Sequence, residues 1–295
     1  MSRILPVALV QTEQVDGDVT AYAAEVAELA AGLPQRPLIV HPEVHLFGGP
    51  SAASVDALRQ RAVSLDSPFV HDLAQLAGDT KSWLVPGSII EPAPDGGVYN
   101  TAIVLSPDGR LVAHYRKIFP WRPSEAYTPG TEFTVFDIPG VGRLGLAICY
   151  DIWFPEVVRQ LTWMGAEAII NPVRTTTPDR RQELVLAQAN AISNQVFMLS
   201  VNAAAPVANG QSLAVGPDGE ILSHAAHDHR AVMRLDIDFD DVDHIRTHGT
   251  AGVNRMWSQF RDTDQPIPLS VYSGRIDPQT WNPNPDTKRR THDHP

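Results

Sequence analysis

Hydrophobic and polar positions along the first 40 residues follow two different periods. Residues 4–10 form an apolar run that ends at the polar Gln11, which predicts a strand. Apolar side chains then recur at helical spacing over residues 22–33, and Asp18 just before them can cap the helix. Residues 38–40 are a short, fully apolar run of the kind that buried strands show. The order strand, helix, strand indicates a layered α/β fold.

The same alternation continues along the rest of the chain. Further helices are predicted at 68–77, 155–164 and 178–193. The last of these has a strong start signal, because Thr177 can cap it and Pro178 fits its first turn. Further strands are predicted at 83–90, 101–105, 111–115, 143–148, 168–171, 197–201, 211–215 and 231–235.

Two stretches of the chain resemble one another. Residues 104–114 read VLSPDGRLVAH, and residues 214–224 read AVGPDGEILSH. Each predicts a hairpin of two apolar strands around a Pro-Asp-Gly turn, and the two lie too far apart for a solenoid repeat. Such turns are common, so chance similarity is the alternative. Two similar halves, each with helices and a hairpin, predict two facing sheets with helices outside them. We therefore expect an α/β protein built as a four-layer αββα sandwich with two pseudo-equivalent halves.

Composition and charge exclude several classes of protein. The chain has 295 residues, of which 43% are hydrophobic and 19% are charged, enough to bury a large core. Its formal net charge of −11 argues against a nucleic-acid partner. No apolar run approaches the roughly 18–20 residues of a membrane span, and residues 1–10 predict a strand rather than a signal peptide. Cys149 is the single cysteine, so an intrachain disulfide is impossible, and we expect a cytoplasmic protein.

The composition changes near residue 261. Five prolines interrupt the chain between residues 266 and 285, and a charged stretch follows them. We therefore expect one folded domain over residues 1–260 and an extended C-terminal arm or tail over residues 261–295. This arm is predicted to cross to a neighbouring subunit.

Cys149 lies at a predicted junction between a strand and a helix. It follows the apolar residues 144–148, and Pro155 shortly after it can open a helix. Backbone N–H groups at such a junction point toward whatever lies there, and nearby donors lower the pKa of a thiol. This is a suitable place for a nucleophile. A free cysteine is also commonly a small buried hydrophobe, so position alone leaves both interpretations open.

Three charged residues are further candidates. Glu43 ends the predicted strand at 38–40, where a carboxylate is costly unless it is paired or used; a cap or turn role is the alternative. Lys117 lies in the aromatic and apolar stretch 114–121, where its ammonium could stabilise an oxyanion or simply extend toward solvent. Glu125 lies in a predicted loop, where a glutamate is ordinarily exposed to solvent.

Four short motifs contain these residues in a fixed order. They are Pro42-Glu43, Arg-Lys-Ile-Phe-Pro-Trp at 116–121, Glu-Ala-Tyr-Thr-Pro-Gly at 125–130 and Ile-Cys-Tyr-Asp at 148–151. Together they resemble the nitrilase superfamily of carbon–nitrogen hydrolases, whose Glu, Lys, Glu and Cys occur in this order, and the separations fit its amidase branch. The resemblance covers residues 3–240. It implies the αββα sandwich and a homodimer or a higher homo-oligomer.

The resemblance also implies a mechanism. Glu43 takes the proton from Cys149, whose sulfur attacks an amide carbonyl carbon. Lys117 and the backbone N–H of Tyr150 hold the resulting oxyanion, and Glu125 positions Lys117 and the incoming amide nitrogen. Glu43 then protonates the departing ammonia or amine, and water hydrolyses the thioester with Glu43 again as the base. No cofactor and no metal is implied.

The residues around the motifs favour amides over nitriles. Nitrile-cleaving members of the family typically follow the cysteine with Trp-Glu, where this chain has Tyr150-Asp151. The stretch 116–121 resembles aliphatic amidases and formamidases, so the expected substrate is a small carboxamide. Candidate residues for oxyanion or substrate binding are Tyr150, Trp121, Trp153, Asn171, Arg174 and Thr175.

Three alternatives to an amidase stay open. An N-carbamoyl amino acid amidohydrolase would use an arginine near the nucleophile to hold a carboxylate, and Arg174 is the nearest candidate, although it also fits a surface loop. A nitrilase is the second alternative. A catalytically silent scaffold of the same fold is the third, but a scaffold would need none of the four motif residues.

One pair of histidines has a spacing that suits zinc. His244 and His248 would lie one helical turn apart. Ile245 follows His244, so the general-base glutamate of a zinc protease is missing, and Gly249 ends the helix. We therefore expect a solvent-exposed pair and no metal in the protein.

Overall fold

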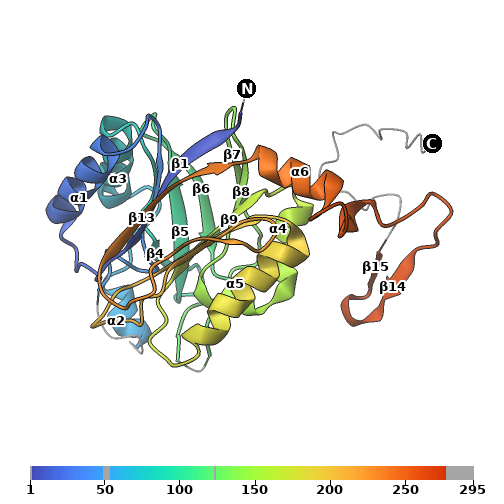
Figure 1. Cartoon of the computed structure of the whole chain (residues 1–295). Coiled ribbons are helices and arrows are strands. Elements are labelled where there is room, and N and C mark those ends of the chain that lie inside the picture. The colour runs from blue at the N-terminus through green and yellow to red at the C-terminus, as the bar shows by residue number, and fades with distance from the viewer. Residues whose placement is uncertain (1, 49–53, 123, 277–295) are drawn as a thin grey trace.

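The first of two facing β-sheets contains strands from both ends of the chain (Figure 1). The structure, a computed structural model, describes residues 2–48, 54–122 and 124–276. The strand order in this sheet is β13-β1-β2-β3-β5-β4, and β6 also pairs with β5. Its strands are β1 (Ile4–Gln11), β2 (Leu38–Val40), β3 (Trp83–Val85), β4 (Ser88–Pro92), β5 (Val98–Leu105), β6 (Leu111–Arg116) and β13 (Ala231–Asp238).

The second sheet has the order β12-β11-β10-β9-β8-β7. Its strands are β7 (Val135–Ile138), β8 (Gly142–Leu146), β9 (Ala168–Val173), β10 (Phe197–Asn202), β11 (Leu213–Val215) and β12 (Ile221–His224). Three parallel strands lie side by side in each sheet, namely β1-β2-β3 and β8-β9-β10. Because parallel strands are covered on both faces, these strands are predominantly apolar, and their hydrophobic runs indicate them in the sequence.

Helices cover the outer face of each sheet (Figure 1). The helices are α1 (Val19–Ala31), α2 (Val55–Arg59), α3 (Pro68–Asp79), α4 (Pro155–Trp163), α5 (Arg180–Asn194) and α6 (Asp240–His248). In β2, Leu38 and Val40 face the second sheet, whereas Ile39 packs in the cluster formed with α1 and α3. A third cluster joins α4 and α5 to the second sheet, with Ile169 of β9 at its centre. Three apolar clusters therefore separate four layers, and the expected αββα sandwich is confirmed.

The two similar stretches form matching hairpins. β5 pairs with β6 and β11 pairs with β12, both antiparallel, around Pro-Asp-Gly turns closed by the same backbone bonds. The register shifts between Val104 and Leu105 in the first hairpin and between Ala214 and Val215 in the second, at corresponding positions. Shared bulges support two structurally equivalent halves.

Two predicted boundaries are wrong. The strand expected at 83–90 is divided into β3 and β4, because the chain turns at Gly87, which has φ +85°. The helix expected from Pro178 begins at Arg180 instead. Thr177 hydrogen-bonds to the Asp179 carboxylate, and its carbonyl accepts a bond from the side chain of Asn209, so the residues before Arg180 belong to a loop.

The C-terminal part of the chain leaves the sandwich after α6. Trp257, in the short turn η2 (Met256–Ser258), is buried. Beyond it, β14 (Ile267–Leu269), η3 (Ser270–Tyr272) and β15 (Gly274–Ile276) form a two-stranded hairpin that projects away from the sheets (Figure 1). Residues 277–295 of the predicted tail lie outside the described residues.

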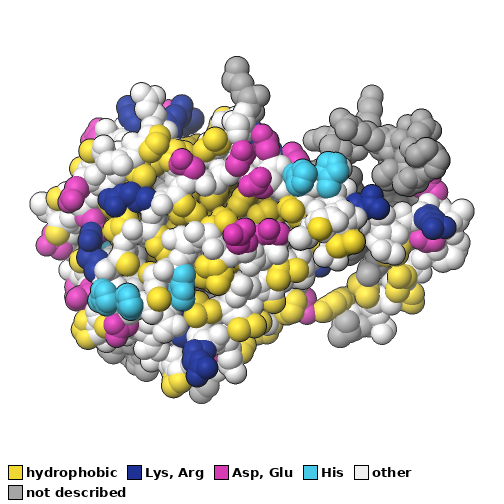
Figure 2. All heavy atoms as spheres, viewed as in Figure 1, with side chains coloured by type: hydrophobic (Ala, Val, Ile, Leu, Met, Phe, Trp, Pro, Cys, Tyr) yellow, Lys and Arg dark blue, Asp and Glu magenta, His cyan; other side chains and the backbone are white. Residues whose placement is uncertain are grey.

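The surface over α6 is strongly polar. Figure 2 shows acidic side chains and histidines gathered over this helix. His244 and His248 are both exposed there, with ring centroids 4.7 Å apart, as the sequence predicted for a solvated pair. Across the described ranges, no helix combines the length and the apolar character needed to cross a bilayer.

Candidate active site

Cys149 lies where the chain turns sharply after β8. It is the first residue of the short turn η1 (Cys149–Trp153), which leads directly into α4. Its φ of +47° is in the left-handed region, which non-glycine residues adopt only when surrounding contacts hold them there. The side chain is 8% exposed and reaches the wall of a cavity. The expected junction between strand and helix is therefore present, and its backbone is strained.

Asp151 holds this turn in place. One carboxylate oxygen accepts hydrogen bonds from the Ile148 N–H and the Tyr115 hydroxyl, both at 2.8 Å. The other oxygen accepts a bond from the Phe119 N–H at 3.0 Å. Burial raises the pKa of Asp151 to about 6, although these hydrogen bonds oppose the shift. Asp151 thus ties the Cys149 turn to the segment that follows β6.

Lys117 joins two carboxylates that are far apart in the sequence. Its Nζ lies 2.9 Å from Glu43 Oε1 and 3.0 and 2.8 Å from the two oxygens of Glu125. Lys117 is 0% exposed and Glu43 is 2% exposed. Burial lowers the pKa of Lys117, but the charges of Glu43 and Glu125 outweigh it and raise the pKa well above its usual value. The group is therefore a buried ammonium between two acids.

The backbone around Glu43 is fixed from several sides. Glu43 follows β2, and its N–H donates to the carbonyl of Val173 on the opposite sheet at 3.3 Å. The Asn100 side chain donates to Glu43 Oε1 at 2.7 Å. Val44 has φ +46°, and its N–H donates to the Ser88 hydroxyl at 3.0 Å. These contacts place the Glu43 carboxylate between the two sheets.

Glu125 closes its own loop. Its N–H donates to the Trp121 carbonyl at 2.9 Å, and its side chain accepts a bond from the Trp121 N–H at 2.7 Å. The side chain is therefore held toward Lys117 and away from the solvent. The interpretation of Glu125 as an ordinary exposed loop residue is wrong.

The Cys149 thiol has two polar neighbours. A hydrogen bond with Cys149 lowers the pKa of Glu43, although burial is the larger effect and the net pKa of Glu43 is raised. On the other side, Thr175 Oγ1 lies 3.9 Å from the sulfur. Burial, and next the charge of Glu43, raise the pKa of Cys149 well above its usual value. The resting group is thus a neutral thiol beside a carboxylate that can accept its proton.

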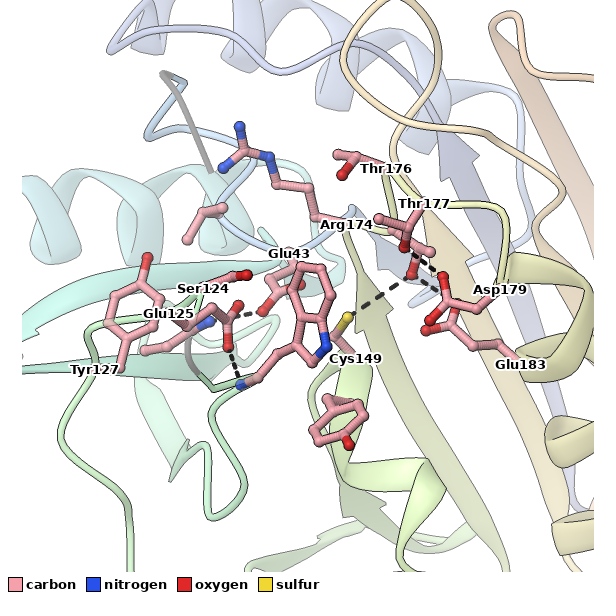
Figure 3. A pocket seen from close by; sticks show the side chains of 15 residues that line it. Glu43, Ser124, Glu125, Tyr127, Cys149, Arg174, Thr176, Thr177, Asp179 and Glu183 are labelled. Carbon is pink, nitrogen blue, oxygen red and sulfur yellow. Dashed lines mark hydrogen bonds between the residues drawn. The ribbon is translucent and has the colours of Figure 1, made fainter. Parts of the chain in front are cut away.

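These side chains line one cavity (Figure 3). The space inside it that is open to the centre of a water-sized molecule is about 40 Å³, which suits a small ligand. Glu43, Glu125 and Cys149 reach its wall, and Lys117 lies behind them. The residues that line it are Glu43, Val44, Asn100, Trp121, Ser124, Glu125, Tyr127, Cys149, Tyr150, Arg174, Thr175, Thr176, Thr177, Asp179 and Glu183.

Four of the six candidate binding residues reach this wall, namely Trp121, Tyr150, Arg174 and Thr175. The other two do not line the cavity. Asn171, in β9, donates to the Ala147 carbonyl at 3.3 Å and accepts from Ser200, so it joins strands instead. The Trp153 indole N–H faces the carboxylate of Glu183 at 3.5 Å, behind the wall. A motif places such residues near the cysteine but does not say which way each side chain points.

Sequence reasoning missed several residues of the site. Three of them hold the candidate residues in place, namely Asn100, Asp151 and Glu183. Glu183 accepts a bond from Thr175 Oγ1 at 2.6 Å and from buried Arg180 at 2.9 Å. The sequence held one signal for Glu183 and Asp151. Each is a carboxylate close to apolar residues of a helical segment, and a carboxylate that is buried there needs a hydrogen-bond or charged partner. Asn100 had none, since its partner Glu43 is distant in the chain.

Comparison with known proteins agrees with this geometry. A family model described as carbon-nitrogen hydrolase matches residues 6–247. A formamidase of Bradyrhizobium sp. (strain ORS 278) is 33% identical over 192 residues, which are 63% of this chain and 56% of the relative. A 2-oxoglutaramate amidase of Paenarthrobacter nicotinovorans is 29% identical over 238 residues, 76% of this chain and 80% of the relative. The matched stretch thus spans little more than half of the formamidase.

Solved structures share the fold. Nit3 of Saccharomyces cerevisiae, a member of branch 10 of the nitrilase superfamily, is 28% identical with a TM-score of 0.75, covering 88% of this chain and 97% of that chain. An amidase from Nesterenkonia sp. AN1 is 25% identical with a TM-score of 0.69, covering 82% and 92%. A mutant of that amidase carries the acetamide moiety of fluoroacetamide covalently on its active-site cysteine. With a family match across most of its length, the present chain belongs to the carbon-nitrogen hydrolase family.

Proposed function

We propose that the protein is a cysteine-dependent amidase that converts a small carboxamide to a carboxylate and ammonia through a thioester. The observation that carries the proposal is the buried Lys117, bonded to both Glu43 and Glu125, with the Cys149 thiol in the wall of the same cavity as the two glutamates. Two relatives named formamidase and 2-oxoglutaramate amidase support the reaction class, as does the amidase that is acylated on its cysteine.

The first half of the reaction uses Glu43 as a base and then as an acid. As the Cys149 sulfur attacks the carbonyl carbon, its proton passes to Glu43, whose raised pKa suits proton exchange near neutral pH. The carbonyl oxygen becomes an oxyanion that Lys117 and the backbone N–H of Tyr150 stabilise. Glu43 then gives the proton to the nitrogen, the C–N bond breaks, and ammonia leaves.

The second half returns the enzyme to its starting state. Glu43 takes a proton from water, and the hydroxide attacks the thioester carbon. The C–S bond then breaks, and the Cys149 sulfur regains the proton that Glu43 holds. The carboxylic acid leaves and gives its own proton to ammonia or water, so the final product is the carboxylate. Throughout, Glu125 holds Lys117 in place through two contacts. Each proton taken by Glu43 is returned, so the cycle needs no cofactor.

Arg174 favours a second group of substrates, amides that also carry a carboxylate. It lines the cavity, and in Figure 3 its guanidinium lies away from Cys149, so a substrate has to be elongated to contact both. N-carbamoyl amino acids and 2-oxoglutaramate both carry a carboxylate in addition to the C–N bond that is cleaved. If Arg174 binds the carboxylate, Arg174→Gln raises KM roughly 10- to 100-fold for these compounds and leaves the KM of acetamide unchanged.

The proposal is tested by ammonia release from a panel of compounds. The panel contains formamide, acetamide, 2-oxoglutaramate, an N-carbamoyl amino acid and a nitrile, each measured with the native chain and with Cys149→Ala. An amidase releases ammonia from at least one amide, and the variant loses this activity. A silent scaffold releases none, and its thiol reacts with an alkylating reagent no faster than free cysteine. His248→Ala, on the exposed face of α6, is the control.

We also propose that the protein is a cytoplasmic homodimer or larger homo-oligomer with a domain at residues 1–260 and an arm beyond. The projecting hairpin of β14 and β15, with exposed Ile267 and Tyr272, supports a contact with a second subunit. The lack of any possible intrachain disulfide is consistent with a reducing compartment.

A further inference from the structure

A second cluster of titratable side chains lies behind Glu43, outside the cavity. His41 and His45 flank Glu43 in the sequence, but they face α1, where Glu25 lies. His41 is 0% exposed and His45 is 1% exposed. One potential metal-binding atom from each of Glu25, His41 and His45 lies within 4.8 Å of the other two. This is a set of two imidazoles and one carboxylate in one place.

His45 is the feature that hydrogen bonding does not explain. Both of its ring nitrogens are buried, and neither has a hydrogen-bond partner among the described residues. A neutral imidazole has one ring nitrogen with a lone pair that can bind a metal ion. An unsatisfied buried polar group costs about 1–3 kcal/mol. Glu25 and His41 satisfy one another at 3.3 Å, but that contact leaves His45 without a partner.

We infer that Glu25, His41 and His45 bind one divalent transition-metal ion, and that zinc fits the ligand set best. Imidazole nitrogens and a carboxylate oxygen are ordinary zinc ligands, and three of them leave one position for water. In tetrahedral zinc sites the bond lengths imply about 3.3 Å between neighbouring ligand atoms. His41 Nε2 and Glu25 Oε2 have this separation. The ligand atoms of the whole set lie within 4.8 Å of one another, so small side-chain shifts would bring them around one ion.

The surroundings prepare these groups for a cation. The Tyr22 hydroxyl lies 3.4 Å from His41 Nδ1, which leaves Nε2 for the ion, and such partners commonly orient metal-binding histidines. Arg230 donates to Glu25 Oε1 at 2.8 Å, so Oε2, which pairs with His41 Nε2, is the oxygen that would bind metal. The ion would replace the proton that His41 Nε2 and Glu25 Oε2 share. The positive charge of Arg230 repels the ion and so weakens its binding to some extent.

This site is structural and takes no part in the reaction. An ion there would connect α1 with the short segment that carries Glu43. Glu25 is 20% exposed on its side chain, which gives the ion a route from solvent. The proposal departs from the expectation of a metal-free protein and stands or falls independently of the amidase proposal.

Zinc titration of the full chain tests the inference. The background is Cys149→Ala, which removes the cavity thiol as a competing ligand. Calorimetry is expected to show one equivalent of tightly bound Zn²⁺, with binding at least about 100-fold weaker after His45→Phe. The matched control, His244→Ala with His248→Ala on the exposed pair, leaves that equivalent unchanged. Absence of the equivalent, or its survival in His45→Phe, overturns the inference.

A second measurement covers the case in which His45→Phe fails to fold. Co²⁺ replaces zinc in the folded Cys149→Ala chain, and its visible spectrum reports the coordination number. Strong absorption bands of a four- or five-coordinate ion, and a Tm raised by Zn²⁺, support the site. A weak spectrum of six-coordinate, water-bound cobalt with no change in Tm contradicts it.

Discussion

Gly87 lies so close to Pro42 that a Cβ atom at position 87 would stand 1.7 Å from the Pro42 carbonyl oxygen. The turn at Gly87 separates β3 from β4, and Pro42 immediately precedes Glu43. The position of the Glu43 carboxylate therefore depends on a glycine that is remote from it in the sequence.

Gly87→Ala is expected to damage both stability and activity. The left-handed φ of +85° costs roughly 1–2 kcal/mol with any side chain, and the clash adds about 1–3 kcal/mol by displacing Pro42 and Glu43. Urea unfolding and kcat measure the two effects. Gly140→Ala is the matched control, since Gly140 has φ +76° but nothing within 4 Å of its Cβ position. Equal losses in the two variants would show that close approach to Pro42 is unimportant.

Lys117→Met leaves two buried carboxylates without their cation. We expect a loss of about 3–5 kcal/mol in the free energy of unfolding and a fall in kcat of roughly 100- to 1000-fold. Denaturant unfolding and steady-state ammonia release measure these changes. The control is Lys81→Met, because Lys81 is exposed. A Lys117 variant with near-native kcat would exclude Lys117 from transition-state stabilisation.

Asp151 predicts a specific dependence of stability on pH. Burial raises the pKa of Asp151 from 3.8 to about 6 in the folded protein, so the folded state binds a proton that the unfolded chain has released. The resulting stabilisation is fully present below pH 3.8 and is lost as the pH rises through 6. Relative to Asp151→Asn, the native free energy of unfolding should therefore fall by about 2 kcal/mol between pH 4 and pH 6.5.

Denaturant unfolding of the native and Asp151→Asn chains across this pH range measures how the difference between their free energies of unfolding changes with pH. Exposed Asp236→Asn is the control and should follow the native curve. A difference between native and Asp151→Asn that is flat, or that grows with pH, contradicts the raised pKa. Independently, kcat should fall in Asp151→Asn. The amide has one acceptor oxygen where the carboxylate has two, so either the Phe119 N–H or the Ile148 N–H with the Tyr115 hydroxyl loses its acceptor.

The C-terminal arm predicts an effect on assembly. A chain that ends at Gln265 lacks both strands of the projecting hairpin, and it should sediment as a smaller species than the full chain. A chain that ends at Ile276 keeps the hairpin and is the control. Analytical ultracentrifugation distinguishes the two. If removal of residues 266–295 leaves the sedimentation coefficient consistent with the original assembly, the arm does not join subunits.

Local patterns predicted the elements whose causes are local. Asp18 accepts a hydrogen bond from the Ala21 N–H at 2.9 Å, as its position before an amphipathic run indicated. The break at Gly87 had a local signal, the Pro86-Gly87 pair, which the prediction of one continuous strand over 83–90 passed over. The close approach of Gly87 to the Pro42 carbonyl had no local signal, because Pro42 lies on a distant segment of the chain. The start of α5 depends in the same way on Asn209, which holds the Thr177 carbonyl.

The residues of the candidate site also fall into those with a local sequence signal and those without one. Glu43, Lys117, Glu125 and Cys149 were found because they occur in motifs with characteristic spacing. Asn100 was missed because its amide matters only through the bond to Glu43, which no sequence window contains. Motif recognition identifies the reacting groups, whereas the residues that orient them become visible only when the sheets face one another.

The central claim is that the Cys149 sulfur carries the acyl group during turnover. Mass spectrometry of the native chain, quenched in acid during turnover of an amide from the panel, tests this most directly. The account predicts a fraction of chains heavier by the acyl group, with the added mass on the peptide that contains Cys149, and no such species in Cys149→Ala. Ammonia release that continues undiminished in Cys149→Ala, with no acylated chain in the native sample, would contradict it.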